Sequence, residues 1–201
     1  MTAVPAQHDV RQHILDIAYP LLLRKGFTAV GLAEVLAAAQ VPKGSFYHYF
    51  GSKEAFGEAV LEAYFADYLG RMDTLLAQPG TAAQRLLDYF YDWLDSQTGD
   101  EAQSRCLVVK LGAEVCDLSE TMRAALARGT GGIVERLARC VEAGRADGSL
   151  AEAVGDARTL GATLYQNWLG ASLLAKITHD RTPLDTALIG TRQLLGLRLY
   201  T

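Results

Sequence analysis

The sequence predicts an all-α protein, and three observations support this fold class. Residues typical of helices, above all Ala, Leu, Glu, Gln and Arg, dominate the chain, whereas patterns typical of β-strands are nearly absent. Apolar residues recur at intervals of three and four, which places them on one face of a helix. Residues that start and stop helices separate these stretches. The nine predicted helices cover residues 8–25, 31–38, 42–49, 52–78, 81–96, 104–116, 119–143, 156–178 and 183–199.

The first three predicted helices form a small N-terminal domain over residues 1–52, and the other six form a second domain over residues 53–201. The first helix stops at Gly26 and contains Pro20, where we expect a kink because proline removes a backbone hydrogen bond. The second and third helices are short, and the turn at residues 39–41 joins them. Two such helices form a helix-turn-helix, whose second helix enters the major groove of DNA.

The stretch at residues 41–50, Val-Pro-Lys-Gly-Ser-Phe-Tyr-His-Tyr-Phe, has the composition of a DNA-reading helix. Pro42 suits the first helical position, and Phe46 and Phe50 lie four residues apart, so that they bury one face. The polar residues then face outward near the helix N-terminus, whose positive dipole end favours phosphate. Ser52 is placed to cap the next helix. The predicted DNA-binding residues are Lys43, Gly44, Ser45, Tyr47, His48, Tyr49 and Lys53.

Composition excludes several classes of protein. The chain has 201 residues and is 50% hydrophobic, but it contains no apolar run of about 18 residues and no signal segment, so we expect a cytoplasmic protein. Its three cysteines form no Cys-x-x-Cys pair, which argues against a disulfide framework or a structural zinc site. The net charge is −4, although residues 1–55 are slightly basic, which is compatible with DNA binding. We find no metal-ligand spacing, phosphate loop or nucleophile–base pattern, and therefore predict no metal, no cofactor and no enzyme activity.

The segment from Gly26 to Phe56 resembles the TetR family of transcriptional regulators, through the run at residues 41–50 and Ser-Lys-Glu-Ala-Phe at 52–56. This resemblance implies a nine-helix TetR-type fold, in which an N-terminal reading head is joined to a sensing and dimerising helical bundle. Two positions depart from the family pattern. Gly31 stands where Thr or Ser often caps the second helix, and Gln40 stands where Gly is common in the turn. Gly31 is a weaker cap and Gln40 adopts positive φ less easily, which puts the turn geometry in question.

The resemblance continues beyond the reading head. Residues 106–120 (Cys-Leu-Val-Val-Lys-Leu-Gly-Ala-Glu-Val-Cys-Asp-Leu-Ser-Glu) and 164–177 (Leu-Tyr-Gln-Asn-Trp-Leu-Gly-Ala-Ser-Leu-Leu-Ala-Lys-Ile) are similar to the NemR repressors. Those proteins control genes for N-ethylmaleimide reductase and glyoxalase and respond to reactive electrophiles through cysteine. The resemblance therefore implies a thiol-based sensor.

Cys106 has the local chemistry that favours a reactive thiolate. We expect Ser104 to cap the sixth helix, which would place Cys106 in its first turn, with Arg105 and Lys110 as nearby cations. Cys106 and Cys116 are ten residues apart, roughly 15 Å along a helix. This spacing argues against a disulfide between them, since its Cα atoms must lie within about 7 Å. Alkylation, a sulfenic acid or capture by an amine fits better, and Lys110 and Lys176 are the candidate amines.

The other two cysteines are less suited to sensing. Cys116 lies beside Glu114 and Asp117, whose charges disfavour thiolate, and Cys140 lies late in its helix. Cysteine also behaves as a small buried hydrophobe, which is the interpretation we favour for both. We keep Cys116 as a secondary sensing candidate.

Aromatic residues and small residues of the second domain suggest two further features. Tyr89, Trp93, Tyr165 and Trp168 lie at helical spacings and are candidate pocket residues, although such stripes more often form a core. Small residues among large ones in the last two helices suit a two-fold, four-helix contact with a second subunit. The predicted dimerisation residues are Gly161, Trp168, Ala171, Ser172, Ala175, Ala187 and Leu194.

These observations predict a homodimeric repressor that binds a palindromic operator and releases it when an electrophile or oxidant modifies Cys106. We expect the modification to shift the packing of the sixth helix on the fourth. Two alternatives remain: a family member induced by a reversibly bound apolar molecule, and a helical enzyme with a vestigial DNA-binding head.

Overall fold

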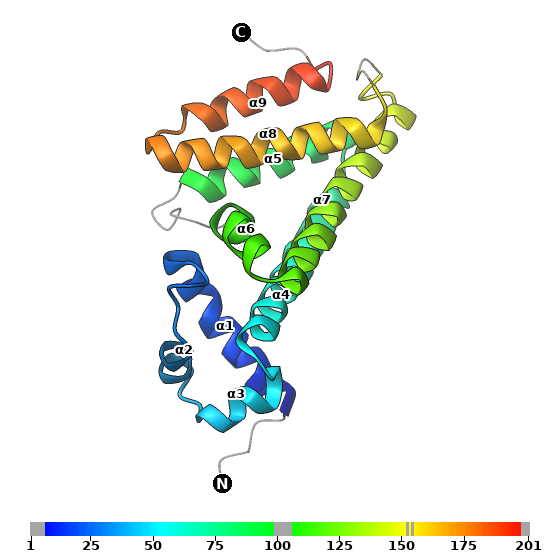
Figure 1. Cartoon of the computed structure of the whole chain (residues 1–201). Helices are drawn as coiled ribbons and strands as arrows, with labels where there is room; N and C mark the ends of the chain where they lie inside the picture. Colours follow the sequence, from blue (N-terminus) through cyan, green and yellow to red (C-terminus); the bar gives the residue numbers. More distant parts are fainter. Residues whose placement is uncertain (1–6, 99–105, 152, 154, 198–201) are drawn as a thin grey trace. The chain divides into compact units, whose positions relative to one another are not determined.

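A computed structural model describes residues 7–98, 106–151, 153 and 155–197. Over these residues it confirms the all-α class, with nine helices and no strand (Figure 1). None of the described helices combines the length and apolar character needed to cross a membrane. The helices are α1 (Gln7–Lys25), α2 (Leu32–Ala39), α3 (Lys43–Phe50), α4 (Lys53–Leu76), α5 (Ala82–Thr98), α6 (Leu107–Leu118), α7 (Glu120–Ala146), α8 (Ala157–Thr178) and α9 (Thr182–Leu194).

Backbone contacts divide the chain into two compact units. The first unit takes its described residues from 7–66 and 106–128, and the second takes them from 67–98 and 129–197. Helix α6, which carries Cys116 and begins just after Cys106, thus belongs to the same unit as the helix-turn-helix. The division differs from a simple boundary after residue 52, because a later stretch of the chain returns to the first unit.

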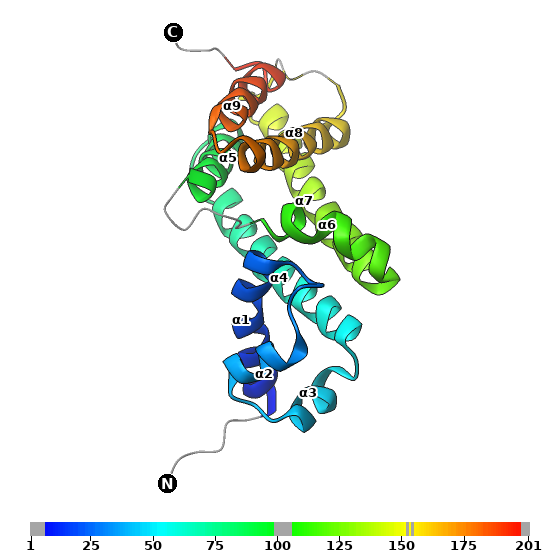
Figure 2. The ribbon, with the colours of Figure 1, turned by 60° about the vertical axis from the view of Figure 1, so that its left-hand side comes forward.

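The core of the first unit is aromatic and aliphatic. Phe46 and Phe50 of α3 meet Phe56 of α4, and the three ring centroids are 5.1–5.2 Å apart. Ile14 and Leu22 of α1 are fully buried, as the period of that helix predicts. Two views show α2 beside α1 within this unit (Figures 1 and 2).

The second unit is built around two tryptophans. Trp168 of α8 is completely buried, stacks on Phe90 of α5 with centroids 5.0 Å apart, and donates its indole N–H to Thr191 at 2.8 Å. Trp93 of α5 donates to the Ser172 hydroxyl at 3.0 Å. Both indole N–H groups are therefore satisfied in the core, which a buried tryptophan requires.

Helix ends follow the predicted signals closely. The Ser52 hydroxyl accepts a hydrogen bond from the Ala55 N–H, and the Asp156 carboxylate accepts one from the Thr159 N–H, so both residues cap their helices. Gly26 follows α1 with φ of +90°, which glycine adopts without strain. The helix α1 runs continuously through Pro20. Pro42 is the N-cap of α3 and not its first residue, so this helix begins one position later than predicted.

Candidate DNA interface and sensor helix

Helix α3 has one buried apolar face and one accessible polar face. Phe46 is fully buried, whereas the Tyr47 side chain is 48% exposed and Lys43 and His48 are exposed as well. Gly44 is also exposed, and Ser45 and Tyr49 are half-buried at the flanks. The predicted DNA-binding residues of α3 therefore share one accessible surface, which matches the requirements of a groove-reading helix.

Two lysines of this region are held over aromatic rings. The Lys43 ammonium lies 5.9 Å from the centroid of the Tyr47 ring, and the Lys53 ammonium lies 4.9 Å from that of Phe27. Such cation–π contacts favour particular side-chain conformations while leaving the charge available to a phosphate. Lys53 lies in the first turn of α4, directly after the cap residue Ser52.

The turn between α2 and α3 accommodates the unusual Gln40. This residue adopts φ of 56° and ψ of 38°, the left-handed conformation that glycine adopts more readily, and its N–H donates to the carbonyl of Ala37. Gly31 is the N-cap of α2 and makes no side-chain cap hydrogen bond. Gln40 thus takes the left-handed conformation that the turn requires, and α2 begins without a side-chain cap.

Cys106 is the N-cap residue of α6, with extended backbone angles, and its side chain is partly exposed. The expectation that Cys106 lies in the first turn is therefore wrong by one position, because the helix begins at Leu107. The predicted cap Ser104 and the flanking Arg105 lie outside the described residues. The Cys106 carbonyl accepts the N–H of Lys110, so the first hydrogen bond of α6 starts at the cysteine itself.

Two side chains of α6 hold the end of α1 and the segment after it. The Lys110 ammonium donates to the carbonyl of Arg24 at 3.0 Å. The Glu114 carboxylate accepts the backbone N–H of Phe27 at 3.0 Å and that of Thr28 at 2.6 Å. These contacts, which we call the α6 clamp, connect the helix that follows Cys106 to the segment that leads into α2.

The clamp depends on Gly26 and on an ionised Glu114. A Cβ atom at Gly26 would lie 3.0 Å from the Glu114 carboxylate, in addition to the strain of its positive φ. Burial raises the pKa of Glu114, but hydrogen bonds from Thr28 and Phe27 and the charge of Lys110 outweigh it, so that the pKa lies below its ordinary value. No local pattern predicts this role, because Glu114 lies 86 and 87 residues from its two partners.

The remaining sensing candidates lie in different environments. Cys140 is buried in α7, as expected, but Cys116 is exposed near the end of α6, so the interpretation of Cys116 as a buried hydrophobe is wrong. Lys110, one of the two amines that could react with a modified Cys106, donates a hydrogen bond to the Arg24 carbonyl. Lys176 lies in the last turn of α8, in the second unit, and its pairing with Cys106 stays a prediction.

The structure places the candidate pocket and dimerisation residues mainly in the core of the second unit. Tyr89, Trp93 and Tyr165 are at most 6% exposed and pack with Trp168 as one aromatic cluster. Among the predicted dimerisation residues, Ala175 and Leu194 are half-buried, and the others are buried within their own subunit: Gly161, Trp168, Ala171, Ser172 and Ala187. A Cβ at Gly161 would lie 2.9 Å from the backbone nitrogen of Ala138, so this glycine permits close packing of α8 on α7.

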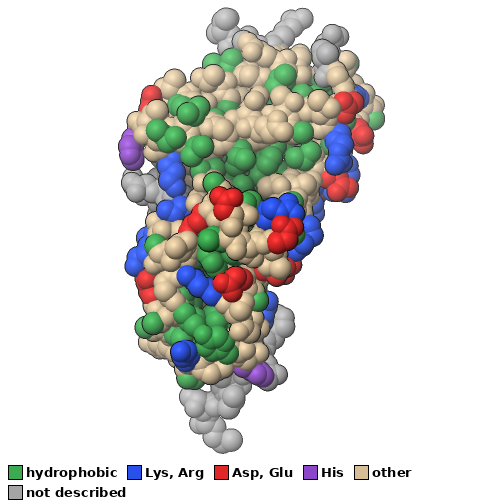
Figure 3. All heavy atoms as spheres, in the orientation of Figure 1, with side chains coloured by type: hydrophobic (Ala, Val, Ile, Leu, Met, Phe, Trp, Pro, Cys, Tyr) green, Lys and Arg blue, Asp and Glu red, His purple; other side chains and the backbone are tan. Residues whose placement is uncertain are grey.

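An accessible apolar face does exist on α8 and α9. Leu173, Leu174, Ile177 and Ile189 are between 47% and 64% exposed. Figure 3 shows apolar side chains over the region of these two helices. These four side chains are the exposed apolar residues that the two helices offer to a partner.

A helix-turn-helix followed by a six-helix body defines a class of DNA-binding regulator, and comparison with known proteins identifies the family. Residues 14–60 match the family described as bacterial regulatory proteins, tetR family, and residues 82–190 match the tetracyclin repressor-like C-terminal domain. The chain belongs to the TetR family.

Individual relatives are similar over almost the whole chain. The HTH-type transcriptional repressor NemR of Escherichia coli K12 is 44% identical over 191 residues, which cover 94% of this chain and 96% of that protein. The repressor DhaR of Mycobacterium sp. GP1 is 33% identical over 90% of this chain and 89% of that protein. The crystal structure of the reduced form of E. coli NemR matches with a TM-score of 0.89 at 44% identity, over 93% of this chain and 97% of that one.

Proposed function

We propose that this protein is a homodimeric transcriptional repressor that releases its operator when an electrophile or oxidant modifies Cys106. The similar proteins NemR and DhaR are both described as repressors, which supports a regulator over an enzyme. We expect it to act in the cytoplasm, where its DNA is accessible. The observation that carries the sensing mechanism is the α6 clamp, because it links the helix capped by Cys106 to the reading head.

The exposed face of α3 enters the major groove in this proposal. Lys43, Ser45 and Tyr47 lie nearer the bases, and the phosphate contacts come from His48, Tyr49 and Lys53. A palindromic operator requires two copies of α3 about 34–36 Å apart, one turn of B-DNA.

Dimerisation uses the apolar face of α8 and α9. Leu174 and Ile177 lie three residues apart on α8, and Ile189 supplies an apolar side chain from α9. Burial of such side chains by a two-fold related copy forms a four-helix contact. The buried small residues of α8 support this contact indirectly, by fixing α8 within its own subunit.

Modification changes the N-cap of α6. When the Cys106 sulfur adds to the β-carbon of a conjugated carbonyl, an S–C bond forms and the thiol proton ends on the α-carbon. The adduct lies at the residue whose carbonyl accepts the Lys110 N–H, so it perturbs the turn that carries the Lys110 contact to Arg24. The route through α4 stays a prediction, and the α6 clamp supports a second route through the end of α1. A coupling of about 1–3 kcal/mol weakens operator binding roughly 5- to 150-fold.

Fluorescence anisotropy with DNA upstream of the protein's own gene tests the proposal. Wild type, Cys106→Ser and the matched control Cys116→Ser are titrated before and after treatment with N-ethylmaleimide. We expect the treatment to release wild type and Cys116→Ser and to leave Cys106→Ser bound. Equal release of Cys106→Ser and wild type would refute Cys106 as the sensor, and failure of all three proteins to bind DNA would refute the repressor assignment.

A further inference from the structure

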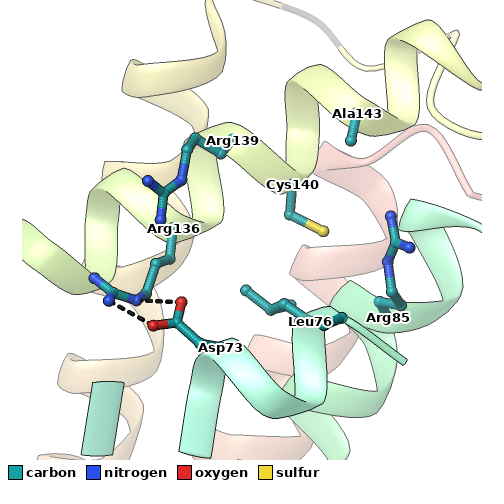
Figure 4. A pocket seen from close by; sticks show the side chains of 8 residues that line it. Asp73, Leu76, Arg85, Arg136, Arg139, Cys140 and Ala143 are labelled. Carbon is teal, nitrogen blue, oxygen red and sulfur yellow. Dashed lines mark hydrogen bonds and ion pairs between the residues drawn. The ribbon is translucent and has the colours of Figure 1, made fainter. Parts of the chain in front are cut away.

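A cavity of about 240 Å³ in the second unit is unrelated to the Cys106 region. The end of α4, the start of α5 and the C-terminal half of α7 form its walls (Figure 4). It is lined by Asp73, Leu76, Ala77, Arg85, Arg136, Arg139, Cys140 and Ala143. Its size suits a small organic molecule, and three of its eight lining residues are arginines.

The charges of this cavity are not balanced. Arg136 and Asp73 form a bidentate ion pair, with both N–O distances at 2.7 Å, so these two residues neutralise each other. Arg85 and Arg139 remain, and the lining contains no second carboxylate. Asp147, outside the lining, lowers the surplus around Arg85 but is itself held by the N–H groups of Ala82 and Ser149. The cavity therefore attracts anions.

Arg85 has hydrogen-bonding capacity left over. Its Nε–H is buried and has no hydrogen-bond partner among the described residues. A buried guanidinium N–H without a partner is costly, and a bound carboxylate satisfies it with the geometry that arginine prefers. This unsatisfied donor makes the cavity more than a chance gap between helices.

The sulfur of Cys140 borders the same space. The side chain is 6% exposed, and its thiol makes a weak hydrogen bond of 3.6 Å to the Ala82 carbonyl. In Figure 4 the sulfur projects from α7 toward the α5 side of the cavity, where Arg85 lies. Burial raises the pKa of Cys140. The positive charge of Arg85 and its side-chain hydrogen bond with the sulfur partly oppose this rise, whereas the negative charge of Asp147 adds to it. An unassisted neutral reagent therefore meets little thiolate at this position.

We propose that this cavity binds small organic carboxylates, with Arg85 and Arg139 as the anion-binding residues. When the bound carboxylate carries an electrophilic carbon, the Cys140 sulfur is the nucleophile that becomes alkylated. The bound anion is held beside the sulfur, so that proximity compensates for the low thiolate population. Cys140 thus forms a charge-selective second modification site. The proposal is independent of DNA binding and of Cys106.

Iodoacetate and iodoacetamide test the charge selectivity, because they have nearly the same size and differ in charge. With either reagent the sulfur displaces iodide, an S–C bond forms as the C–I bond breaks, and the thiol proton passes to solvent. The reaction is run on the folded Cys106→Ser protein, where only Cys116 and Cys140 remain, and peptide mass mapping gives the rate at each thiol. Cys116 is the internal reference, since it is exposed and lies between Glu114 and Asp117.

We expect the ratio of Cys140 to Cys116 modification to be about tenfold higher with iodoacetate than with iodoacetamide, as a partly solvated charge pair predicts. Arg85→Gln should remove most of this difference while leaving the iodoacetamide rate at Cys140 within about twofold. Arg139→Gln should remove a smaller part, since Arg139 is exposed.

The matched control is Arg71→Gln, which removes an arginine of the same unit that lies outside the cavity. The proposal is overturned if both reagents give the same ratio, if Arg71→Gln acts as strongly as Arg85→Gln, or if neither reagent modifies Cys140 in the folded protein.

Discussion

Glu114→Gln tests the α6 clamp at its central residue. The carboxylate accepts two backbone N–H groups at 3.0 and 2.6 Å, and the amide retains only one acceptor oxygen while turning an NH₂ group toward the other donor. A hydrogen bond to a charged group contributes about 1.5–3 kcal/mol. Because this site is only half-buried, solvent compensates part of the loss, and we expect the free energy of unfolding to fall by about 1–2 kcal/mol.

The assay is urea unfolding followed by far-UV circular dichroism, at one protein concentration because the protein is expected to dimerise. Circular dichroism is preferred to tryptophan fluorescence because both tryptophans, Trp93 and Trp168, lie in the second unit and report on that unit first. The matched control is Glu120→Gln, which removes an exposed carboxylate of the same unit that pairs with Arg123. We expect this control to unfold close to the wild type.

The pH dependence gives a second criterion for the same substitution. The pKa of Glu114 is lower in the folded protein than its ordinary value of 4.5. Its ionised form therefore contributes stability that is fully present above the unfolded pKa and is lost as pH falls through the folded pKa. The difference between wild type and Glu114→Gln should be constant near neutral pH and shrink below about pH 4.5. Equal stability of Glu114→Gln and Glu120→Gln, or a difference unchanged in acid, would refute the clamp.

Four further predictions concern packing, the turn, DNA and the dimer. Gly57→Ala should lower the free energy of unfolding by about 1–3 kcal/mol in the same urea assay. A Cβ at this position would lie 2.4 Å from the Met122 sulfur and 2.6 Å from the Phe27 ring. Gly70→Ala is the control, because a Cβ there would meet open space. Gln40→Gly should raise stability by about 1 kcal/mol through relief of the left-handed conformation, and Gln40→Val should lower it. Lys53→Gln should reduce the slope of log affinity against log salt by about 2 per dimer in anisotropy titrations, if each subunit loses one phosphate contact; an unchanged slope would remove Lys53 from the interface. Ile177→Glu should convert the dimer to monomer in light scattering, whereas Ile177→Leu should not.

Local sequence signals predicted the fold because each acts within a few residues. Ser52 and Gly26 mark helix ends through the chemistry of their own side chain or backbone, and both do so in the structure. The burial of Phe46 follows from its spacing to Phe50, which also predicted the exposed polar surface of α3. Such features need no knowledge of tertiary contacts.

Features that depend on distant residues were not predictable in the same way. Small residues of α8 indicate close helix approach, but the pattern does not say whether the neighbour is α7 or a second subunit, and Gly161 packs on α7. Along the sequence Glu114 is only an unfavourable neighbour of Cys116, and nothing local connects it to Phe27 and Thr28. The arginines near Cys140 come from α5 and α7, so their meeting at one cavity appears only once the helices are packed.

The donors that Glu114 binds are main-chain N–H groups, and this has a consequence for how such proteins diversify. Residues other than proline can be exchanged at positions 27 and 28 without removing either donor, whereas the contact is lost with Glu114 and strained by a Cβ at Gly26. The residues of the recognition helix can therefore change to bind new operators while the α6 clamp is retained. Grafting the reading head of a relative onto this body should transfer sequence preference and keep inducibility, provided that the glycine is retained.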